Sequence, residues 1–128
     1  MKLLLDTCAF LWIATGDRAL SRAAREAFTD PSNEVYLSAI SAWEIALKHA
    51  LGKLPLPEPP MVLVPNLRGR HHIEALPLDE RAALAVAQLP ELHRDPFDRM
   101  LICQTIMGGF MLVTPDPLIT QYAVPTLW

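Results

Sequence analysis

Only two cysteines, Cys8 and Cys103, occur among the 128 residues of the chain. Two are too few for the disulfide framework of a small secreted domain, and they do not make a zinc-binding set. Both lie in apolar stretches, where we interpret them as small buried thiols. We therefore expect a cytoplasmic protein in a reducing compartment.

Long hydrophobic runs are also missing, since no apolar stretch approaches the roughly 20 residues that a membrane-spanning helix needs. The opening MKLLLDTCAFLWIA has one basic residue and an apolar stretch, as a signal peptide does. Asp6 interrupts this stretch, however, and no small-residue cleavage site follows it cleanly. We expect no membrane association and no secretory signal.

Positive charge is scarce, because 11 lysines and arginines stand against 14 aspartates and glutamates. The formal net charge of −3 gives no global attraction to nucleic acid, so a polyanionic partner must meet a local basic patch. Hydrophobic residues make up 52% of the chain and charged residues 20%, which is typical of a globular protein. The length predicts a single domain over residues 1–128.

Short apolar runs alternate along the chain with segments of helical periodicity. Strands are predicted at residues 2–6, 34–38, 73–78, 110–114 and 123–128. Helices are predicted at residues 8–17, 21–28, 39–53, 80–89, 96–107 and 117–122, with a loop and one short helix in the proline-rich segment 54–72. The alternation predicts a three-layer α/β fold, in which a small, mainly parallel, twisted sheet is flanked by helices.

Acidic residues recur where such a sheet binds ligands, at the carboxyl ends of its strands. Asp6 follows the first predicted strand, and Asp116 follows the fourth. Asp98 lies in the first turn of the helix that precedes the Asp116 strand. Glu44 lies in the helix after the second strand, so all four acids are candidates for one site.

Ordinary structural roles are open to most of these acids. Asp95 before Pro96 has the pattern of a helix N-cap, which Asp116 repeats before Pro117, and Asp98 falls where a carboxylate favours the helix dipole. Glu44 can pair with Lys48 one turn later. Asp6 is different, because an ionised carboxylate in an apolar stretch costs several kcal/mol unless it is paired or bound to a metal.

If the acids converge, their repulsion requires compensation. Two carboxylates about 4 Å apart repel by roughly 4 kcal/mol at an effective dielectric of 20. Either some of them are protonated or a cation joins them. An all-oxygen cluster favours a hard divalent ion, Mg²⁺ or Mn²⁺, and such an ion supports the chemistry of metal-dependent nucleases.

Four segments in this order resemble the PIN domain family, and more narrowly its VapC-type toxins of bacterial toxin–antitoxin pairs. They are LLLDT, SAISAWEIALK, HRDPFDRMLICQT and LVTPD. The resemblance covers the whole chain and implies a Mg²⁺- or Mn²⁺-dependent ribonuclease. It assigns catalysis and metal binding to Asp6, Glu44, Asp98 and Asp116. Pro115, in TPD, departs from the residue that these toxins often carry there.

Further residues are candidates for supporting roles. Asp95 is interpreted as a cap or as a group that supports the metal ligands, and Thr7 as a hydroxyl that holds a carboxylate, a metal-bound water or nearby backbone. His49 and His93 are interpreted as ordinary polar residues. The residues proposed to contact RNA phosphates are Arg94 and Arg99, which flank Asp98, and Arg18, Arg22 and Arg25. The last three are spaced four and three apart and are expected to share one helix face, which is either a solvated face or a phosphate-binding stripe. Trp12, Trp43 and Trp128 are mostly candidates for the core.

The resemblance also implies a cognate antitoxin that covers the active site, an RNA substrate and a toxin homodimer. One alternative is a catalytically silent PIN-like module that only binds partners, although all four acids are retained. A Mg²⁺-dependent phosphoacceptor would need a lysine near the last strand, and a phosphatase of the haloacid dehalogenase type would need an aspartate at position 8. The chain has neither group.

Overall fold

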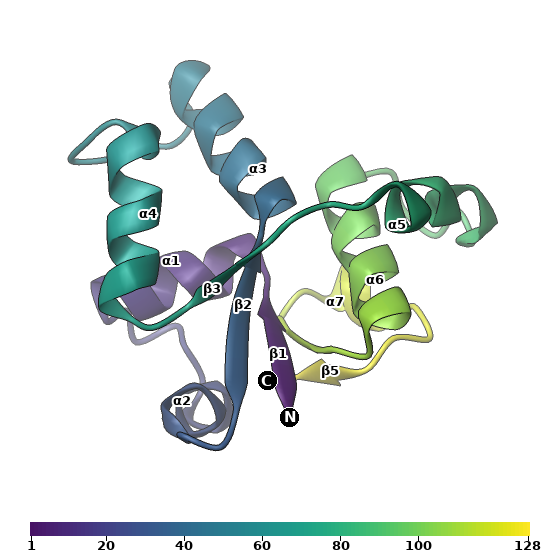
Figure 1. The fold of residues 1–128 in the computed structure, drawn as a ribbon. Coiled ribbons are helices and arrows are strands. Elements are labelled where there is room, and N and C mark those ends of the chain that lie inside the picture. Colours follow the sequence, from purple (N-terminus) through teal and green to yellow (C-terminus); the bar gives the residue numbers. More distant parts are fainter.

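The computed structural model describes all 128 residues and contains one parallel five-stranded sheet with the strand order β3-β2-β1-β4-β5 (Figure 1). All four strand pairings are parallel, and Leu4 of the central strand is in register with Tyr36 and with Leu112. The strands are β1 (Lys2–Leu5), β2 (Glu34–Ser38), β3 (Glu74–Leu76), β4 (Met111–Val113) and β5 (Thr126–Leu127). This confirms the predicted α/β fold.

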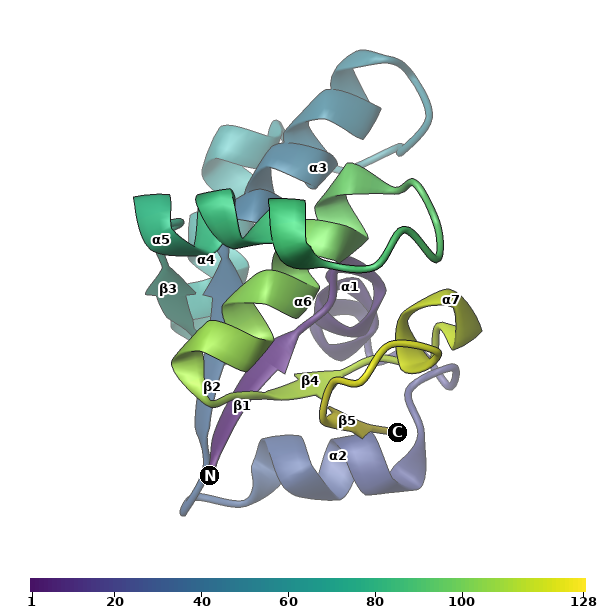
Figure 2. The same ribbon diagram turned by 90° about the vertical axis from the view of Figure 1, so that its right-hand side faces the viewer.

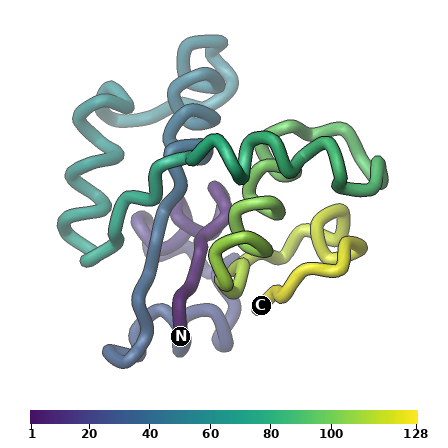
Figure 3. The backbone as a smooth tube through the Cα atoms, turned by 45° about the vertical axis from the view of Figure 1, so that its right-hand side comes forward, coloured from purple at the N-terminus to yellow at the C-terminus, as the bar shows by residue number.

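Helices cover both faces of the sheet and give the molecule three layers (Figures 1 and 2). They are α1 (Thr7–Thr15), α2 (Arg22–Thr29), α3 (Ala39–Ala50), α4 (Pro60–Arg70), α5 (Glu80–Ala85), the 3₁₀ helix η1 (Val86–Gln88), α6 (Pro96–Gly108) and α7 (Pro117–Thr120). After β3 an extended path carries the chain to α5 and α6 on the other side of the sheet (Figure 3). None of these helices has the length and apolar character to cross a bilayer.

The alternation of side chains along β1 divides the core in two. Leu3 and Leu5 pack with residues of α1, α3 and α4, whereas Leu4 packs on the opposite face with residues of α6 and α7. All three leucines are fully buried. Burial on both faces explains why β1 reads as a continuous apolar run, as is usual for the central strand of a parallel sheet.

Several predicted elements differ from the structure in length. In the proline-rich segment, where a loop and one short helix were predicted, the helix is α4, which starts with Pro60, has 11 residues and tolerates Pro65 in its interior. The helix predicted at 80–89 is shorter, because α5 ends at Ala85 and continues as η1. The strands β3, β4 and β5 are also shorter than their predicted ranges, and each has only two or three residues.

Candidate active site

The carboxyl ends of β1 and β4 lie side by side, since these strands pair directly. The strand order reverses direction at this point, because β2 lies on one side of β1 and β4 on the other. A crevice outside such a switch point is the usual ligand site of an open parallel sheet. Asp6 follows β1 and Asp116 lies just beyond β4, so the sheet brings the first and the last predicted acid together.

Asp6 is buried, with only 5% of its surface exposed, and serves as the N-cap of α1. Its Oδ1 accepts a hydrogen bond from the backbone N–H of Ala9 at 2.7 Å and one from the Cys8 thiol at 3.1 Å. Burial raises the pKa of Asp6 above its ordinary value, and the negative charge of Asp116 adds to this rise. Cys8 therefore contacts a site residue and is half-buried, whereas Cys103 is buried as expected.

Asp98 lies in the first turn of α6, with its side chain 16% exposed. Burial raises the pKa of Asp98 to about 6, and the negative charges of Asp95 and Asp116 act in the same direction. A hydrogen bond from His93 opposes this rise, because it stabilises the ionised carboxylate. Asp98 is therefore an acid whose charge is poorly compensated in the protein alone.

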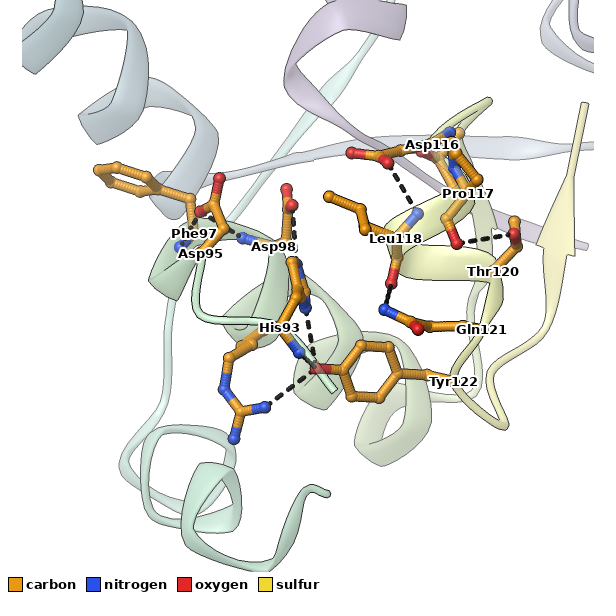
Figure 4. A network of polar contacts seen from close by, with 12 residues as sticks. His93, Asp95, Phe97, Asp98, Asp116, Pro117, Leu118, Thr120, Gln121 and Tyr122 are labelled. Atoms are coloured by element: carbon orange, nitrogen blue, oxygen red, sulfur yellow. Dashed lines mark hydrogen bonds and ion pairs between the residues drawn. The ribbon is translucent and has the colours of Figure 1, made fainter. Parts of the chain in front are cut away.

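Asp116 is the common neighbour of the two buried aspartates, because its charge acts on both Asp6 and Asp98. It is the N-cap of α7, where its Oδ1 accepts a hydrogen bond from the backbone N–H of Leu118 at 2.9 Å. Its carboxylate and that of Asp98 face the same gap between α6 and α7 (Figure 4). The departure at Pro115 does not remove Asp116 from the site.

Glu44 lies on α3, where Thr7 and Lys48 contact its carboxylate. It is buried, and its Oε1 accepts a hydrogen bond of 2.6 Å from the Thr7 hydroxyl. Its Oε2 forms an ion pair with Lys48, as the spacing predicted. The hydrogen bond to Glu44 raises the pKa of Lys48, and the negative charges of Asp95 and Asp98 contribute to this rise. Glu44 and Lys48 therefore lie near the α6 acids.

Asp95 is the N-cap of α6, as predicted. Its Oδ1 accepts hydrogen bonds from the backbone N–H groups of Phe97 at 2.9 Å and Asp98 at 3.2 Å. The cap thus fixes the turn that carries Asp98. The second oxygen of Asp95 makes no hydrogen bond within the chain, and in Figure 4 the carboxylate lies beside that of Asp98.

The donor groups fit a hard divalent cation in their chemistry. Asp6, Asp98 and Asp116 offer carboxylate oxygens and make no ion pair with a lysine or arginine. Burial raises the pKa values of Asp6 and Asp98, and the negative charge of Asp116 adds to both rises. As the side chains stand, no three His, Cys, Asp or Glu residues are close enough together to form a complete metal-binding cluster. Side-chain adjustment would therefore accompany binding of an ion.

His93 contacts a predicted site residue, although the sequence suggested only an ordinary polar role. Its Nε2 lies 3.0 Å from Oδ2 of Asp98, and its Nδ1 lies 2.8 Å from the Tyr122 hydroxyl. The His93 ring also packs edge-on against the Tyr122 ring. The HRDPFDR segment places His93 near Asp98, but no pattern links it to Tyr122, which lies 29 residues further along the chain.

Arg99, predicted to contact an RNA phosphate, makes several hydrogen bonds within the chain. Its guanidinium donates hydrogen bonds to the Pro90 carbonyl at 2.8 Å, to the Leu89 carbonyl at 3.3 Å and to the Tyr122 hydroxyl at 3.0 Å. These bonds tie α6 to the segment that precedes His93. Arg94 makes no hydrogen bond or ion pair within the chain, and it lines an open polar pocket together with Glu91, His93 and Arg99.

The predicted stripe of Arg18, Arg22 and Arg25 is wrong as a single helix face. Helix α2 begins only at Arg22 because Ser21 caps it, so Arg18 lies outside the helix. Arg22 pairs with Glu26 at 3.1 Å. Helix α2 also lies beside the amino ends of β1 and β2, away from the acidic end of the sheet (Figures 1 and 2).

The prediction that the tryptophans are mostly buried fails for Trp43, which is 57% exposed. Its ring packs edge-on against Phe97, with 5.0 Å between the ring centroids. Trp43 is therefore an exposed aromatic residue on α3, next to Glu44 in the sequence. Trp12 and Trp128 agree better with the prediction, since they pack against each other and against the core.

Comparison with known proteins connects this geometry to a family. A family model of the PIN domain matches residues 3–125. Ribonuclease VapC22 of Mycobacterium tuberculosis is 27% identical over 129 residues, which cover 98% of this chain and 97% of that protein. Ribonuclease VapC16 of the same organism is 48% identical over 50 residues, and that match spans only 39% of this chain and 36% of VapC16.

Solved structures share the fold at lower sequence identity. A chain of VapBC2 from Rickettsia felis, bound to a promoter DNA fragment, superposes with a TM-score of 0.73 at 14% identity, covering 98% of this chain and 97% of that one. A chain of VapBC-1 from nontypeable Haemophilus influenzae gives a TM-score of 0.66 at 15% identity, covering 98% and 96%. At these identities the likeness establishes the fold alone.

Proposed function

The chain belongs to the PIN domain family, and from that premise we propose that it is a Mg²⁺- or Mn²⁺-dependent endoribonuclease. The observation that carries the proposal is the placement of Asp6, Asp98 and Asp116 at the switch point of the sheet, where the carboxylates of Asp98 and Asp116 face the same gap (Figure 4). The names of VapC22 and VapC16, both ribonucleases, support the choice of RNA as substrate. We propose that residues 1–128 work as a single PIN domain.

Asp6, Asp98, Asp116 and Glu44 are the residues that we propose to hold the ion. When bound, a divalent ion lowers the pKa of water and stabilises the charge that develops on a phosphoryl group. The chain itself orients the ligands. The Thr7 hydroxyl holds one oxygen of Glu44, and the Asp95 cap holds the turn that carries Asp98. Arg94 is the retained candidate for a contact with an RNA phosphate.

A toxin role follows from the same relatives. The similar solved structures include VapBC complexes, and we propose a cognate antitoxin that covers the acidic site of this chain and inhibits it. We also propose a homodimer that acts in the cytoplasm. Copurification with a candidate antitoxin, together with loss of RNA cleavage in the complex, would test this proposal.

Cleavage of a mixed cellular RNA pool tests the enzymatic proposal. Purified wild-type protein, Asp6→Asn and Asp30→Asn are incubated with Mg²⁺, with Mn²⁺ or with EDTA. Asp30 is a matched control, because it is an exposed aspartate in the turn before β2. We expect metal-dependent cutting by wild type and Asp30→Asn, and at least about a 100-fold loss in Asp6→Asn. A wild-type protein that binds the metal but cuts no RNA would favour a silent partner-binding module.

A further inference from the structure

Tyr122 and His93 form a buried pair behind the Asp98 carboxylate. Tyr122 lies just after α7 and is 5% exposed, and the side chain of His93 is 9% exposed. Dashed lines in Figure 4 connect the Tyr122 hydroxyl to His93, and His93 to Asp98. The three groups thus form a chain of polar contacts that starts in the core of the α6–α7 side and ends at the site.

The hydrogen bonds around the Tyr122 oxygen determine where its proton lies. The backbone N–H of His93 donates to this oxygen at 3.2 Å, and the guanidinium of Arg99 donates to it at 3.0 Å. A phenolic oxygen accepts two hydrogen bonds and donates one. Both accepting positions are therefore filled. The remaining partner, Nδ1 of His93 at 2.8 Å, accepts a hydrogen bond from the Tyr122 hydroxyl.

This assignment also determines the tautomer of His93. A ring nitrogen that accepts a hydrogen bond carries no proton of its own, so the proton of the neutral imidazole is on Nε2. Nε2 lies 3.0 Å from Oδ2 of Asp98 and donates to it. The donor chain therefore runs in one direction, from the Tyr122 hydroxyl through the imidazole to the carboxylate.

We propose that Tyr122 and His93 are positioning residues for Asp98: Tyr122 holds His93 in the Nε2-protonated tautomer, and His93 holds one oxygen of the carboxylate so that the other faces Asp116. The functional consequence rests on the proposed metal-dependent nuclease. An imidazole that donates from Nε2 occupies one oxygen of the Asp98 carboxylate and leaves the other available to a cation. Hydrogen-bonded groups behind metal ligands commonly orient the ligands in this way.

Arg99 and the backbone N–H of His93 belong to the same hydrogen-bond network. They occupy the two accepting positions of the Tyr122 oxygen, and without them the hydroxyl would be free to accept from the imidazole instead. Arg99 thus has a contact with Tyr122 in addition to the open polar pocket that it lines with Arg94. The network also gives Tyr122 a function that its place in the apolar core does not suggest.

Long-range ¹H–¹⁵N NMR of the metal-free, ¹⁵N-labelled wild-type protein tests the tautomer directly. Protonated and unprotonated ring nitrogens give distinct ¹⁵N shifts, and the His93→Gln spectrum identifies the His93 signals among those of the four histidines. We expect protonation at Nε2 only. Protonation at Nδ1, at both nitrogens, or a fast mixture of tautomers at neutral pH would overturn the proposal.

Substitutions then test the effect on Asp98, with Mn²⁺ affinity as the readout. We expect Tyr122→Phe and His93→Leu to weaken Mn²⁺ binding by about 10- to 100-fold, which is typical for groups behind metal ligands. His93→Gln keeps a donor toward Asp98 and should retain more affinity than His93→Leu. Tyr36→Phe, at the only other tyrosine, is the matched control and should change neither the affinity nor the tautomer.

The two measurements separate this inference from the proposed function. If Tyr122→Phe is folded by circular dichroism and binds Mn²⁺ as wild type does, the positioning role is refuted while the nuclease proposal stands. If wild type has the Nε2 tautomer but binds no Mn²⁺, the proposed metal-dependent function fails and only the donor chain remains. A Tyr122→Phe variant that does not fold leaves the wild-type NMR spectrum to decide.

Discussion

Three aspartates at the site each combine a structural role with an available ligand oxygen. Asp6, Asp95 and Asp116 cap α1, α6 and α7, and each uses the same oxygen, Oδ1, for its backbone contacts. An ionised carboxylate has two oxygens and about four accepting positions, so a cap does not exhaust it. Capping and metal binding are therefore compatible for the same side chain, and the caps aim the remaining oxygens.

Asp98→Asn should change how the stability of the metal-free protein depends on pH. The pKa of Asp98 is about 6 in the folded protein and 3.8 ordinarily, so the folded state binds more protons between about pH 4 and 6. The free energy of unfolding of wild type should therefore fall as pH rises through this window, by at most about 3 kcal/mol and by less with partial solvent access.

Urea unfolding in EDTA at pH 4 and pH 7.5 measures this effect. The amide that replaces the carboxyl group does not titrate, so the stability of Asp98→Asn relative to wild type should be greater at pH 7.5 than at pH 4. An unchanged difference between the two proteins at both pH values would show that Asp98 is ionised as readily in the folded state as in the unfolded one.

The contact between Thr7 and Glu44 predicts a second effect at the scale of one residue. Thr7→Val keeps the shape of the side chain but leaves one oxygen of a buried carboxylate without its 2.6 Å hydrogen bond. We expect a loss of about 1–3 kcal/mol in the free energy of unfolding, measured by urea denaturation. Thr7→Ser restores the hydroxyl and should recover most of it, and equal losses in both variants would refute this role.

At the scale of secondary-structure elements, the start of α6 positions Asp98, whose pKa is raised to about 6. Asp95 caps the helix and Pro96 occupies its first position, where a missing N–H costs nothing. At the other end Gly109 adopts a left-handed conformation with φ of 69°, which ends the helix at little steric cost. These local signals explain why the boundaries of α6 were predicted almost correctly.

Asp95→Ala should destabilise the protein by about 1 kcal/mol, because it removes the acceptor for the N–H groups of Phe97 and Asp98. Asp95→Ser is the matched comparison, since serine caps a helix without a charge. Thermal unfolding in EDTA should place Asp95→Ser close to wild type. If serine destabilises the protein as much as alanine does, the charge of Asp95 matters more than its cap.

The lengths of other elements were harder to predict, for identifiable reasons. Helix α4 accommodates Pro65 because it packs through Val64 and Leu67 onto the core. The strand predicted at 73–78 is reduced to β3, a short edge strand with two exposed residues. In both cases tertiary contacts influence the length of the element, whereas local propensity is all that a single sequence displays.

At the scale of the whole molecule, the topology decides which predicted residues meet. The order of strands and helices along the chain was sufficient to place Asp6 and Asp116 at one end of the sheet. It was not sufficient to find the partners of Asp98, because Tyr122 reaches His93 only after α6, β4 and α7 have folded back on each other. Trp43 was likewise assigned to the core on hydrophobicity, although more than half of its surface is exposed and its ring packs edge-on against Phe97.

The same topology explains why the overall charge was a poor guide to the site. The acids gather at the carboxyl ends of the strands, while Arg22 and Arg25 lie on α2 at the amino ends. The molecule is thus electrostatically uneven, and Arg94 and Arg99, which flank Asp98 in the sequence, make no ion pair with an acid. A hard cation is the counter-charge that we propose for this end of the protein.

Calorimetric titration of Mn²⁺ into the metal-free protein at pH 7.5 tests this central claim most directly. Wild type, Asp116→Asn and the control Asp30→Asn are compared, because Asp116 is the acid whose charge acts on both Asp6 and Asp98. We predict saturable binding to wild type and Asp30→Asn, and at least about a tenfold weaker affinity in Asp116→Asn. Equal affinity in all three proteins would contradict the account, because the ion would then bind elsewhere.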